Sequence, residues 1–270
     1  MTESFTGQKI YNMLKGDDSM SFKIHDDGIA LDAVIDMPEN TNGKVPLCII
    51  IHGFTGNKEE RHLLAVSKMM NEIGMATLRV DMYGHGKSDG EFRKHTLFKW
   101  LTNALTVIDY ARALPDFSRI YLCGHSQGGL ITIMAGAMKQ DIISGLIPMS
   151  PAVMIPEEAR EGNILGTQID LSDLSKDYTS EDGWTLNGNY VCVAQMLYPE
   201  ESIKKFKGPV IVTQGDADYS VPFEKVEKAV KGYDNCNFVR IEGDSHCYDY
   251  HLDVVVEELK KYMLKEGWNL

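Results

Sequence analysis

A serine flanked by glycines, in Gly124-His125-Ser126-Gln127-Gly128, has the residue types and spacing of a nucleophilic turn. A short apolar run, residues 120–124, precedes it, and apolar residues at helical spacing follow from Leu130 onward. In such a strand–turn–helix the turn is sharp and strained, and the glycines let strand and helix approach closely. The Ser126 hydroxyl then lies beside a helix N-terminus, where developing negative charge is stabilised. The segment therefore predicts a serine nucleophile for acyl transfer.

A serine hydroxyl needs a neighbouring base to become a good nucleophile. Where a strand–turn–helix presents the serine, an acid and then a histidine follow it along the chain. Two histidines lie late enough, His246 and His251. His246 lies in a loop directly after a predicted strand, residues 237–241, whereas His251 begins the final helix and is expected to face solvent. We therefore predict that His246 is the general base.

The acid is expected on the loop that follows the predicted strand at residues 210–214. Asp218 is the preferred residue, because the Val-Pro pair that follows it fixes the loop and starts the next helix. It would orient the imidazole and stabilise its protonated form. Asp216 is an alternative, with the competing role of bonding loop N–H groups. Asp244 is a second alternative, although it lies very near His246 in sequence.

Two backbone N–H groups are needed to stabilise the oxyanion of the tetrahedral intermediate. One is predicted to come from Gln127, directly after the nucleophile, and the other from Phe54, in the loop 52–56. Each such donor typically lowers the barrier by ~3–4 kcal/mol. His52 and His125 flank these two turns, and we expect both to be packed, hydrogen-bonded residues that hold the loops.

The sequence predicts neither a metal nor a cofactor. No His/Cys/Asp group has the spacing of a metal site, and no glycine-rich loop fits a phosphate or dinucleotide. The predicted chemistry needs only side chains and backbone N–H groups.

Predicted strands and helices alternate through most of the chain. Residues 20–26 and 29–37 form an expected edge hairpin around the turn 26–28, and residues 46–51 form a continuous apolar strand. Further strands are expected at 75–80, 119–123, 144–149, 210–214 and 237–241, and helices at 61–73, 96–113, 223–231 and 252–264. Alternation of this kind predicts an α/β fold with a mostly parallel sheet and helices on both faces.

Residues 152–207 interrupt this alternation. They contain several glycines and acidic residues and only short apolar pieces, and they are too many for a simple connection. We interpret them as a lid, or substrate-binding subdomain, inserted in one α/β domain that spans residues 1–270. In open α/β sheets, ligands bind outside the carboxyl ends of the strands, where this insertion begins.

Composition limits the function classes. The chain has 270 residues, 43% of them hydrophobic and 24% charged, as in ordinary globular proteins. Its net charge of −12 argues against binding to nucleic acids or to anionic membranes.

The cysteines and the apolar segments indicate a cytoplasmic protein. The five cysteines are odd in number and include no C-x-x-C pair, which indicates free thiols in a reducing compartment. The first twenty residues contain no apolar run, so no signal peptide is expected there. The longest strongly apolar stretch, residues 45–51, is too short to span a bilayer.

Several motifs together resemble the α/β-hydrolase superfamily. They are His-Gly-Phe at 52–54, Asp-Met-Tyr-Gly-His-Gly-Lys-Ser at 81–88, Gly-His-Ser-Gln-Gly-Gly at 124–129, Asp-x-x-Val-Pro at 218–222 and Gly-Asp-Ser-His-Cys-Tyr at 243–248. Three more specific segments, Ser-Pro-Ala at 150–152, Gly-Asn-Tyr-Val-Cys-Val-Ala-Gln at 188–195 and His-Cys-Tyr at 246–248, are similar to the intracellular bacterial cinnamoyl (feruloyl) esterases.

This resemblance implies a serine carboxylesterase that hydrolyses hydroxycinnamate esters through an acyl-enzyme intermediate. It also implies that the lid forms the phenol-binding pocket, with Tyr190 and Glu158 at the hydroxyl end of the aromatic ring. Leu165 stands where some relatives have glutamine, which leaves the preferred ring substitution open. The expected partner is a small aromatic ester, and the chain is compatible with a homodimer.

Two other functions remain open. A general short-chain carboxylesterase or monoacylglycerol-type lipase would use the same fold and the same catalytic residues. A non-catalytic binding protein is a remote alternative, because a binder gains nothing from a strained serine turn.

Overall fold

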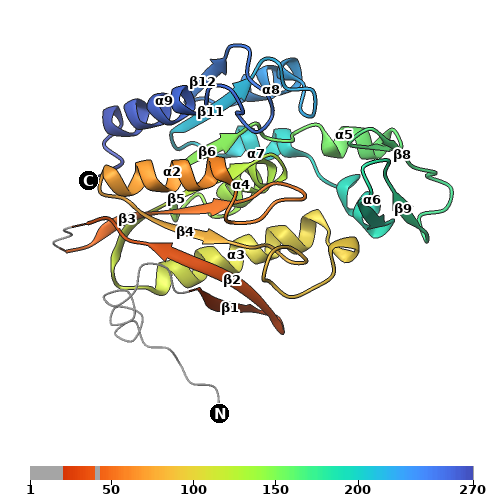
Figure 1. The fold of residues 1–270 in the computed structure, drawn as a ribbon, viewed down its shortest axis with the longest axis horizontal. Helices are drawn as coiled ribbons and strands as arrows, with labels where there is room; N and C mark the ends of the chain where they lie inside the picture. Colours follow the sequence, from red (N-terminus) through yellow and green to blue (C-terminus); the bar gives the residue numbers. More distant parts are fainter. Residues whose placement is uncertain (1–20, 40–42, 270) are drawn as a thin grey trace.

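One twisted sheet organises the part of the chain that the computed structural model describes, residues 21–39 and 43–269 (Figure 1). It has eight strands in the order β1-β2-β4-β3-β5-β6-β11-β12. Their bounds are β1 Phe22–Asp26, β2 Ile29–Asp36, β3 Val45–Ile51, β4 Ala76–Val80, β5 Phe117–His125, β6 Ile143–Met149, β11 Val210–Gly215 and β12 Cys236–Ile241. β2 is antiparallel to both of its neighbours, and the strands from β4 to β12 pair in parallel. The predicted mostly parallel sheet is confirmed.

The central strand β3 is buried along its whole length, because helices cover both faces of the sheet. Its alternate side chains point to opposite faces. Leu47, Ile49 and Ile51 join one hydrophobic cluster, whereas Cys48 and Ile50 join the other. A continuous apolar run is therefore what this position in the sheet requires.

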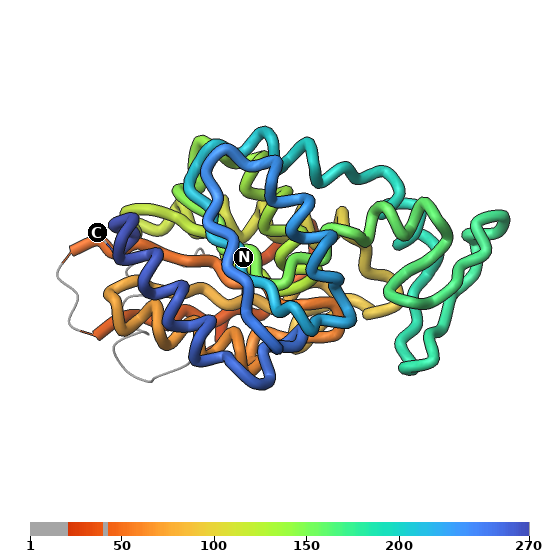
Figure 2. Tube along the Cα trace, turned by 90° about the horizontal axis from the view of Figure 1, so that it is seen from above, coloured from red at the N-terminus to blue at the C-terminus, as the bar shows by residue number. Residues whose placement is uncertain are grey.

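Helices in two layers, one on each face of the sheet, contribute apolar side chains to these two clusters (Figures 1 and 2). Helices α2 (Arg61–Glu72) and α9 (Leu252–Lys265) cover one face. Helices α3 (Leu97–Ala113), α4 (Gln127–Met138), α7 (Pro199–Lys205) and α8 (Phe223–Val230) pack on the other face. A short 3₁₀ helix, η1 (Phe92–Lys94), precedes α3. The predicted helices therefore lie on both sides of the sheet.

The edge hairpin is confirmed. Asp27 and Gly28 both have positive φ, 45° and 79°, between antiparallel β1 and β2. A tight two-residue turn needs positive φ at both central positions, which suits the Asp-Gly pair. Residues 1–20, in which no signal peptide was expected, lie outside the described residues. They include Met20, the first residue of the expected first strand. No helix within the described ranges is long and apolar enough to cross a membrane.

The chain leaves the sheet at the carboxyl end of β6 and projects away from it (right side of Figures 1 and 2). This excursion comprises α5 (Ile155–Arg160), β7 (Asn163–Ile164), β8 (Thr167–Gln168), β9 (Asp177–Thr179), β10 (Thr185–Asn187) and α6 (Asn189–Ala194). We call it the lid segment. β7 pairs with β8 and β9 with β10, each as a separate two-stranded ribbon. The next helix, α7, falls within the expected insertion 152–207 but packs against α4. The role of residues 152–207 as a substrate-binding lid stays a prediction.

Candidate active site

The serine turn has the strained geometry of a nucleophile elbow. Ser126 lies between β5 and α4 with φ 56° and ψ −119°, a backbone conformation that is costly for a residue with a side chain. Its N–H donates to the Met149 carbonyl at 2.9 Å, which ties the turn to β6. A Cβ on Gly124 would collide with the Gly128 carbonyl, and one on Gly128 with the carbonyl of Ile51. Glycine is therefore required on both sides of the turn.

His246 and Asp218 come together, although they lie on different loops. The imidazole Nδ1 lies 2.7 Å from Asp218 Oδ2. Because the carboxylate only accepts, this contact fixes the hydrogen on Nδ1 and leaves Nε2 free to take a proton. The Asp218 carboxylate is itself held by the N–H groups of Ser220 and Val221, at 2.9 and 2.8 Å, and by Gln214 Nε2 at 2.9 Å.

The two alternative carboxylates have other partners. Asp216 accepts from the Gly243 N–H and from Arg240, each at 2.6 Å. Asp244 is fully buried and accepts from backbone N–H groups, including that of His251 at 3.1 Å. His251 itself is exposed at the start of α9. Among the described residues, neither carboxylate bonds to the histidine that Asp218 holds.

The loop after β3 lies against the serine turn. A Cβ built on Gly53 would lie 3.2 Å from Ser126 Cβ, so only glycine fits there without displacement. The next residue, Phe54, has an N–H without an acceptor among the described residues, as does Gln127 at the first position of α4. Both predicted oxyanion donors therefore lie next to Ser126 in chain or space and remain available to a ligand.

His52 holds this loop in place. Its Nε2 accepts from the Met82 N–H at 3.0 Å, so its Nδ1 carries the hydrogen and donates to the Gly53 carbonyl at 2.7 Å. Burial lowers the pKa of His52 to about 3, which keeps the ring neutral. These contacts agree with the structural role predicted for His52.

One contact of the expected triad is open. No hydrogen bond joins the Ser126 hydroxyl to His246 among the described residues, whereas His246 is bonded to Asp218. Ser126 itself is 8% exposed. In enzymes of this kind that contact is often long without substrate and tightens in the complex.

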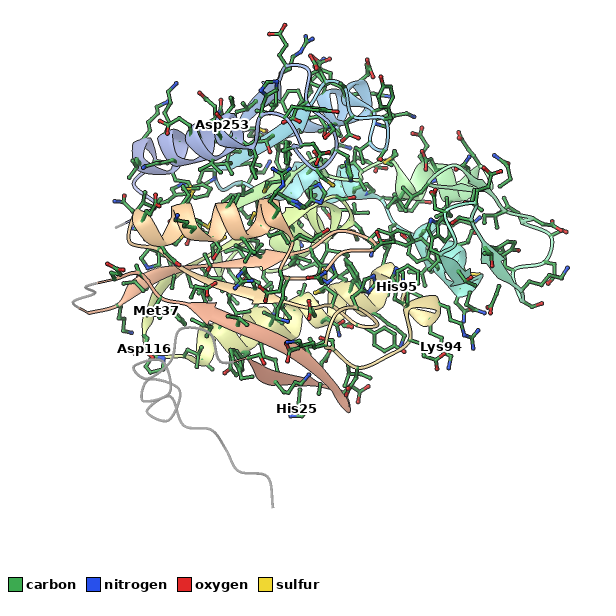
Figure 3. The ribbon with its side chains drawn as sticks, in the orientation of Figure 1. His25, Met37, Lys94, His95, Asp116 and Asp253 are labelled. Atoms are coloured by element: carbon green, nitrogen blue, oxygen red, sulfur yellow. The ribbon has the colours of Figure 1, made fainter. Side chains whose placement is uncertain are left out.

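Two lid residues approach the proposed oxyanion donors. Tyr190 is fully buried, and its hydroxyl donates to Gln127 Oε1 at 2.7 Å. Its ring centroid lies 6.2 Å from that of Phe54 and 5.2 Å from that of His95, which is labelled in Figure 3. Trp184 packs edge-on against Phe54, with centroids 5.3 Å apart. Burial raises the pKa of the Tyr190 hydroxyl.

Glu158, the other predicted lid residue, is partly buried on α5. Its Oε2 accepts from the Leu165 N–H at 3.4 Å. Burial raises the pKa of this carboxyl, and its charge in turn contributes to the raised pKa of the Tyr190 hydroxyl. The helices that carry these residues, α5 and α6, contact one another in the lid segment.

Tyr248 was not predicted as a site residue, although it lies in one of the motifs that carry the family resemblance. Its buried hydroxyl contacts Ser150 Oγ at 3.0 Å and Thr213 Oγ1 at 2.8 Å, and it donates to the Thr213 carbonyl at 3.1 Å. These contacts join the loop that carries His246 to the ends of β6 and β11. The pattern of His-Cys-Tyr together with Ser-Pro-Ala was the signal that could have identified this contact.

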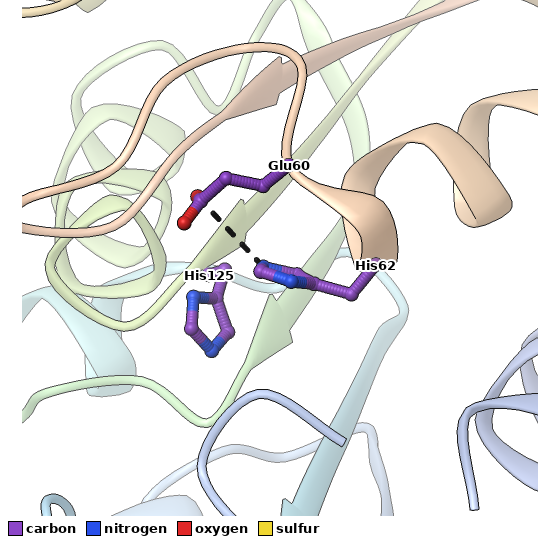
Figure 4. Close-up of side chains that lie close together, drawn as sticks. All are labelled: Glu60, His62 and His125. Carbon is purple, nitrogen blue, oxygen red and sulfur yellow. Dashed lines mark ion pairs between the residues drawn. The ribbon is translucent and has the colours of Figure 1, made fainter. Parts of the chain in front are cut away.

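His125 faces a second group of side chains (Figure 4). Its Nε2 donates to the His246 carbonyl at 2.8 Å, in agreement with the structural role predicted for His125. One ligand atom from each of Glu60, His62 and His125 lies within 4.8 Å of the other two. A metal site was not expected from the sequence, because Glu60 and His62 lie far from His125 along the chain.

Known proteins similar to this chain agree with this geometry. The family profile described as "Serine aminopeptidase, S33" matches residues 44–176. Est1E from Butyrivibrio proteoclasticus, in a structure with ferulic acid bound, is 54% identical, with a TM-score of 0.88. That match covers 90% of this chain and 98% of the Est1E chain.

More distant relatives share part of their length with this chain. The mitochondrial palmitoyl-protein thioesterase ABHD10 of Mus musculus is 25% identical over 68% of this chain and 62% of its own length. The monoglyceride lipase of Mus musculus is 27% identical over 57% of this chain and 59% of its own length. This chain therefore matches less than two thirds of the length of these curated relatives. The match to Est1E covers both chains nearly in full. The chain belongs to the serine esterases of the α/β-hydrolase superfamily.

Proposed function

We propose that this chain hydrolyses esters of hydroxycinnamic acids, such as ferulate, p-coumarate and caffeate, to the free acid and an alcohol. The observation that carries the proposal is the similarity to Est1E, whose structure was determined with ferulic acid bound. The two chains are 54% identical, and the match covers 98% of the Est1E chain. The pairing of His246 with Asp218 at 2.7 Å supports catalysis by a serine mechanism.

In the proposed reaction Ser126 Oγ attacks the ester carbonyl while His246 Nε2 takes its proton. The Phe54 and Gln127 N–H groups stabilise the oxyanion of the tetrahedral intermediate, and Asp218 stabilises the protonated imidazole. The intermediate collapses as His246 returns the proton to the leaving alcohol, which leaves the acyl group on Ser126. Water, activated by the same histidine, then releases the hydroxycinnamate.

The aromatic acyl group is proposed to bind beneath the lid, residues 152–207. Trp184 and Tyr190 each pack against Phe54 where the lid segment meets the proposed oxyanion loop, and ligand pockets are typically lined by such rings. Tyr190 and Glu158 are proposed to recognise the phenol end of the ring, since they supply polar groups from α6 and α5, two helices that contact one another.

The experiment compares initial rates on methyl ferulate, methyl cinnamate, p-nitrophenyl butyrate and a long-chain monoacylglycerol, with Ser126→Ala as the inactive control. We expect the highest kcat/KM on methyl ferulate. A preference for the monoacylglycerol would support the lipase alternative, which the similarity to monoglyceride lipase favours. Negligible turnover of every hydroxycinnamate ester would contradict the proposed substrate class.

The phenol contact is tested in the same assay with Tyr190→Phe and Glu158→Gln. Methyl cinnamate has no phenol hydroxyl, so loss of a contact to that hydroxyl lowers kcat/KM for methyl ferulate alone. An equal loss on both esters would assign the two side chains to lid packing instead.

A fluorophosphonate probe separates an enzyme from a non-catalytic binder. We expect covalent labelling of the parent chain and none of Ser126→Ala. A folded parent chain that resists the probe would support the binding-protein alternative.

Two further properties belong to this proposal. A cytoplasmic location is supported by the five cysteines, all of which are free thiols. A homodimer is testable by light scattering after size exclusion. The proposed catalytic groups all come from this one chain, so we expect the specific activity per chain to be independent of protein concentration.

A further inference from the structure

Three buried atoms beside the serine turn lack partners. Glu60 Oε2, His62 Nε2 and His125 Nδ1 have no hydrogen-bond partner among the described residues, although each is shielded from solvent. His62 is 3% exposed and His125 2% exposed. Buried polar atoms nearly always have a hydrogen-bond partner, so three side chains that lie close together, each with an unpartnered atom, are suited to binding a cation or a water molecule.

Each of these side chains can offer a lone pair to a cation, since a neutral imidazole has one free ring nitrogen and a carboxylate accepts on both oxygens. His125 donates its Nε2 hydrogen to the His246 carbonyl at 2.8 Å, so its Nδ1 carries the free lone pair. Metal-binding histidines characteristically use the second ring nitrogen in this way, to bond a backbone carbonyl. Burial lowers the pKa of His62 to about 4 and that of His125 well below its usual value, so both rings are neutral at pH 7.

The separations fit a small cation after a modest adjustment. Glu60 Oε2 lies 4.0 Å from His62 Nε2, and one ligand atom from each of the three residues lies within 4.8 Å of the other two. For three atoms separated by about 4.0–4.8 Å, the point equidistant from all of them is about 2.3–2.8 Å from each, compared with ~2.0–2.2 Å for zinc bonds to imidazole and carboxylate. A shift of the glutamate side chain, which is 26% exposed, is the simplest way to close this difference.

We propose that Glu60, His62 and His125 form a binding site for a divalent transition-metal cation of the zinc type. Two imidazoles and one carboxylate favour zinc and its neighbours over magnesium or calcium, which prefer all-oxygen sites. The partly exposed Glu60 carboxylate provides the entry path. Water is expected to complete the coordination as the fourth ligand.

The site would join two parts of the proposed catalytic machinery. Glu60 is the N-cap of α2 and His62 lies in its first turn, whereas His125 comes from the end of β5 (Figure 4). The loop that carries Phe54 precedes Glu60, and Ser126 directly follows His125. A bound cation would cross-link this loop to the serine turn and stabilise the folded state. The inference does not depend on the proposed substrate, because the serine mechanism requires no metal.

The test measures binding of Zn²⁺ by calorimetry and of Co²⁺ by visible absorption, on the full chain after treatment with a chelator. The variants are Glu60→Gln and His62→Ala, and the matched control is His25→Ala, an exposed histidine on β1 (labelled in Figure 3). We expect one saturable site with a tetrahedral Co²⁺ spectrum and a rise in Tm with Zn²⁺. Loss of a residue that only bonds to a metal ligand typically lowers metal affinity by ~10–100-fold. We expect each variant, which loses a ligand itself, to lower the affinity by more than this, while the control binds like the parent.

Two results would overturn the proposal. Absence of saturable binding would mean that the three atoms enclose a water molecule. Binding that is unchanged in Glu60→Gln and His62→Ala would place the metal elsewhere, for example on His246 and Cys247. Circular dichroism of each variant establishes folding, and Glu60→Gln keeps the side-chain size if His62→Ala fails to fold.

Discussion

At the scale of single residues, the difference between Asp218 and Asp216 lies in what their oxygens contact. Asp218 is 6% exposed and meets the imidazole of His246, whereas Asp216 lies on the same loop and meets Arg240. Two carboxylates so close in sequence therefore perform different tasks. The first orients the proposed base, and the second ties its loop to the end of β12.

Asparagine in place of each aspartate separates these tasks. In Asp218→Asn the amide can donate to His246 Nδ1, which favours the wrong tautomer, and we expect kcat to fall by about 10⁴-fold, as in other serine triads. In Asp216→Asn we expect kcat to stay within about threefold, since such surface contacts contribute little. Steady-state kinetics on methyl ferulate measure both values. Comparable losses in the two variants would contradict the assignment of Asp218.

Sequence reasoning was most effective for residues next to a predicted strand end. The order of serine, acid and histidine, together with the strand ends, placed Asp218 and His246 on loops that the fold does bring together. The contacts of Tyr190 could not be obtained in this way. Its bond to Gln127 joins an irregular excursion to a core helix, and no periodic pattern predicts such a meeting.

At the scale of secondary-structure elements, Tyr248 connects the loop of the proposed base to two strands. The Tyr248 backbone has φ 56°, in the left-handed region. The Tyr248 hydroxyl lies between Ser150 and Thr213, at the carboxyl ends of β6 and β11. Burial raises the pKa of this hydroxyl, which therefore stays protonated and able to donate. The loop is thus attached to the sheet by a group only two residues from the proposed base.

Removal of this hydroxyl is expected to weaken the attachment while the ring stays in place. Tyr248→Phe leaves buried Ser150 and Thr213 oxygens short of a partner, so we expect a loss of about 1–3 kcal/mol in the free energy of unfolding. We also expect kcat to fall more than KM rises, because the imidazole is less firmly held. Urea denaturation and steady-state kinetics measure the two effects. An unchanged kcat would show that the attachment serves stability alone.

Elements were predicted well where periodic apolar patterns set them. The helix expected at 96–113 is α3, Leu97–Ala113, with Thr96 as its N-cap, because capping and apolar spacing agree there. Contacts between loops were not predicted. Buried Lys58 bridges Asp32 and Asp81, each at 2.7 Å, and nothing in the local sequence distinguishes this lysine from an exposed one.

At the scale of the whole molecule, two hydrophobic clusters on opposite faces of one sheet support the strained turn between β5 and α4. Strain at a single residue persists only where the surrounding structure determines its conformation. Here β5 pairs with two strands, α4 is largely buried, and the loop after β3 approaches Ser126 through Gly53. The fold therefore holds the serine in place with packing drawn from both layers.

Glycine at position 126 is expected to stabilise the protein. Ser126→Gly removes backbone strain of ~1–3 kcal/mol, partly offset by the ~0.5–1 kcal/mol of extra freedom that glycine gives the unfolded chain. We therefore expect the free energy of unfolding to rise by about 1 kcal/mol while hydrolysis is lost. Ser126→Ala is the matched control, because it loses the hydroxyl but keeps the Cβ and the strain. Thermal and urea unfolding measure the change, and equal stability of the two variants would argue against strain.

The fold class was predictable from the sequence because its pattern of strands and helices is regular. Alternating strands and helices allow few topologies, and a parallel sheet covered on both faces leaves a continuous apolar run at β3. The lid segment was recognised only as an interruption. Its two short ribbons and two short helices depend on contacts with the rest of the molecule, for which a single sequence carries little signal.

The conformation of Ser126 also bears on how such a chain would change over generations. If selection for hydrolysis ceased, a change from serine to glycine at this position would no longer be opposed by the loss of activity. The change would also make the folded protein more stable. The flanking Gly124 and Gly128 would remain, since any side chain there collides with backbone. Descendants that had become binding proteins would then carry three glycines in this turn. The stability of the fold alone therefore gives no reason for a serine at φ 56°, whereas the proposed reaction does.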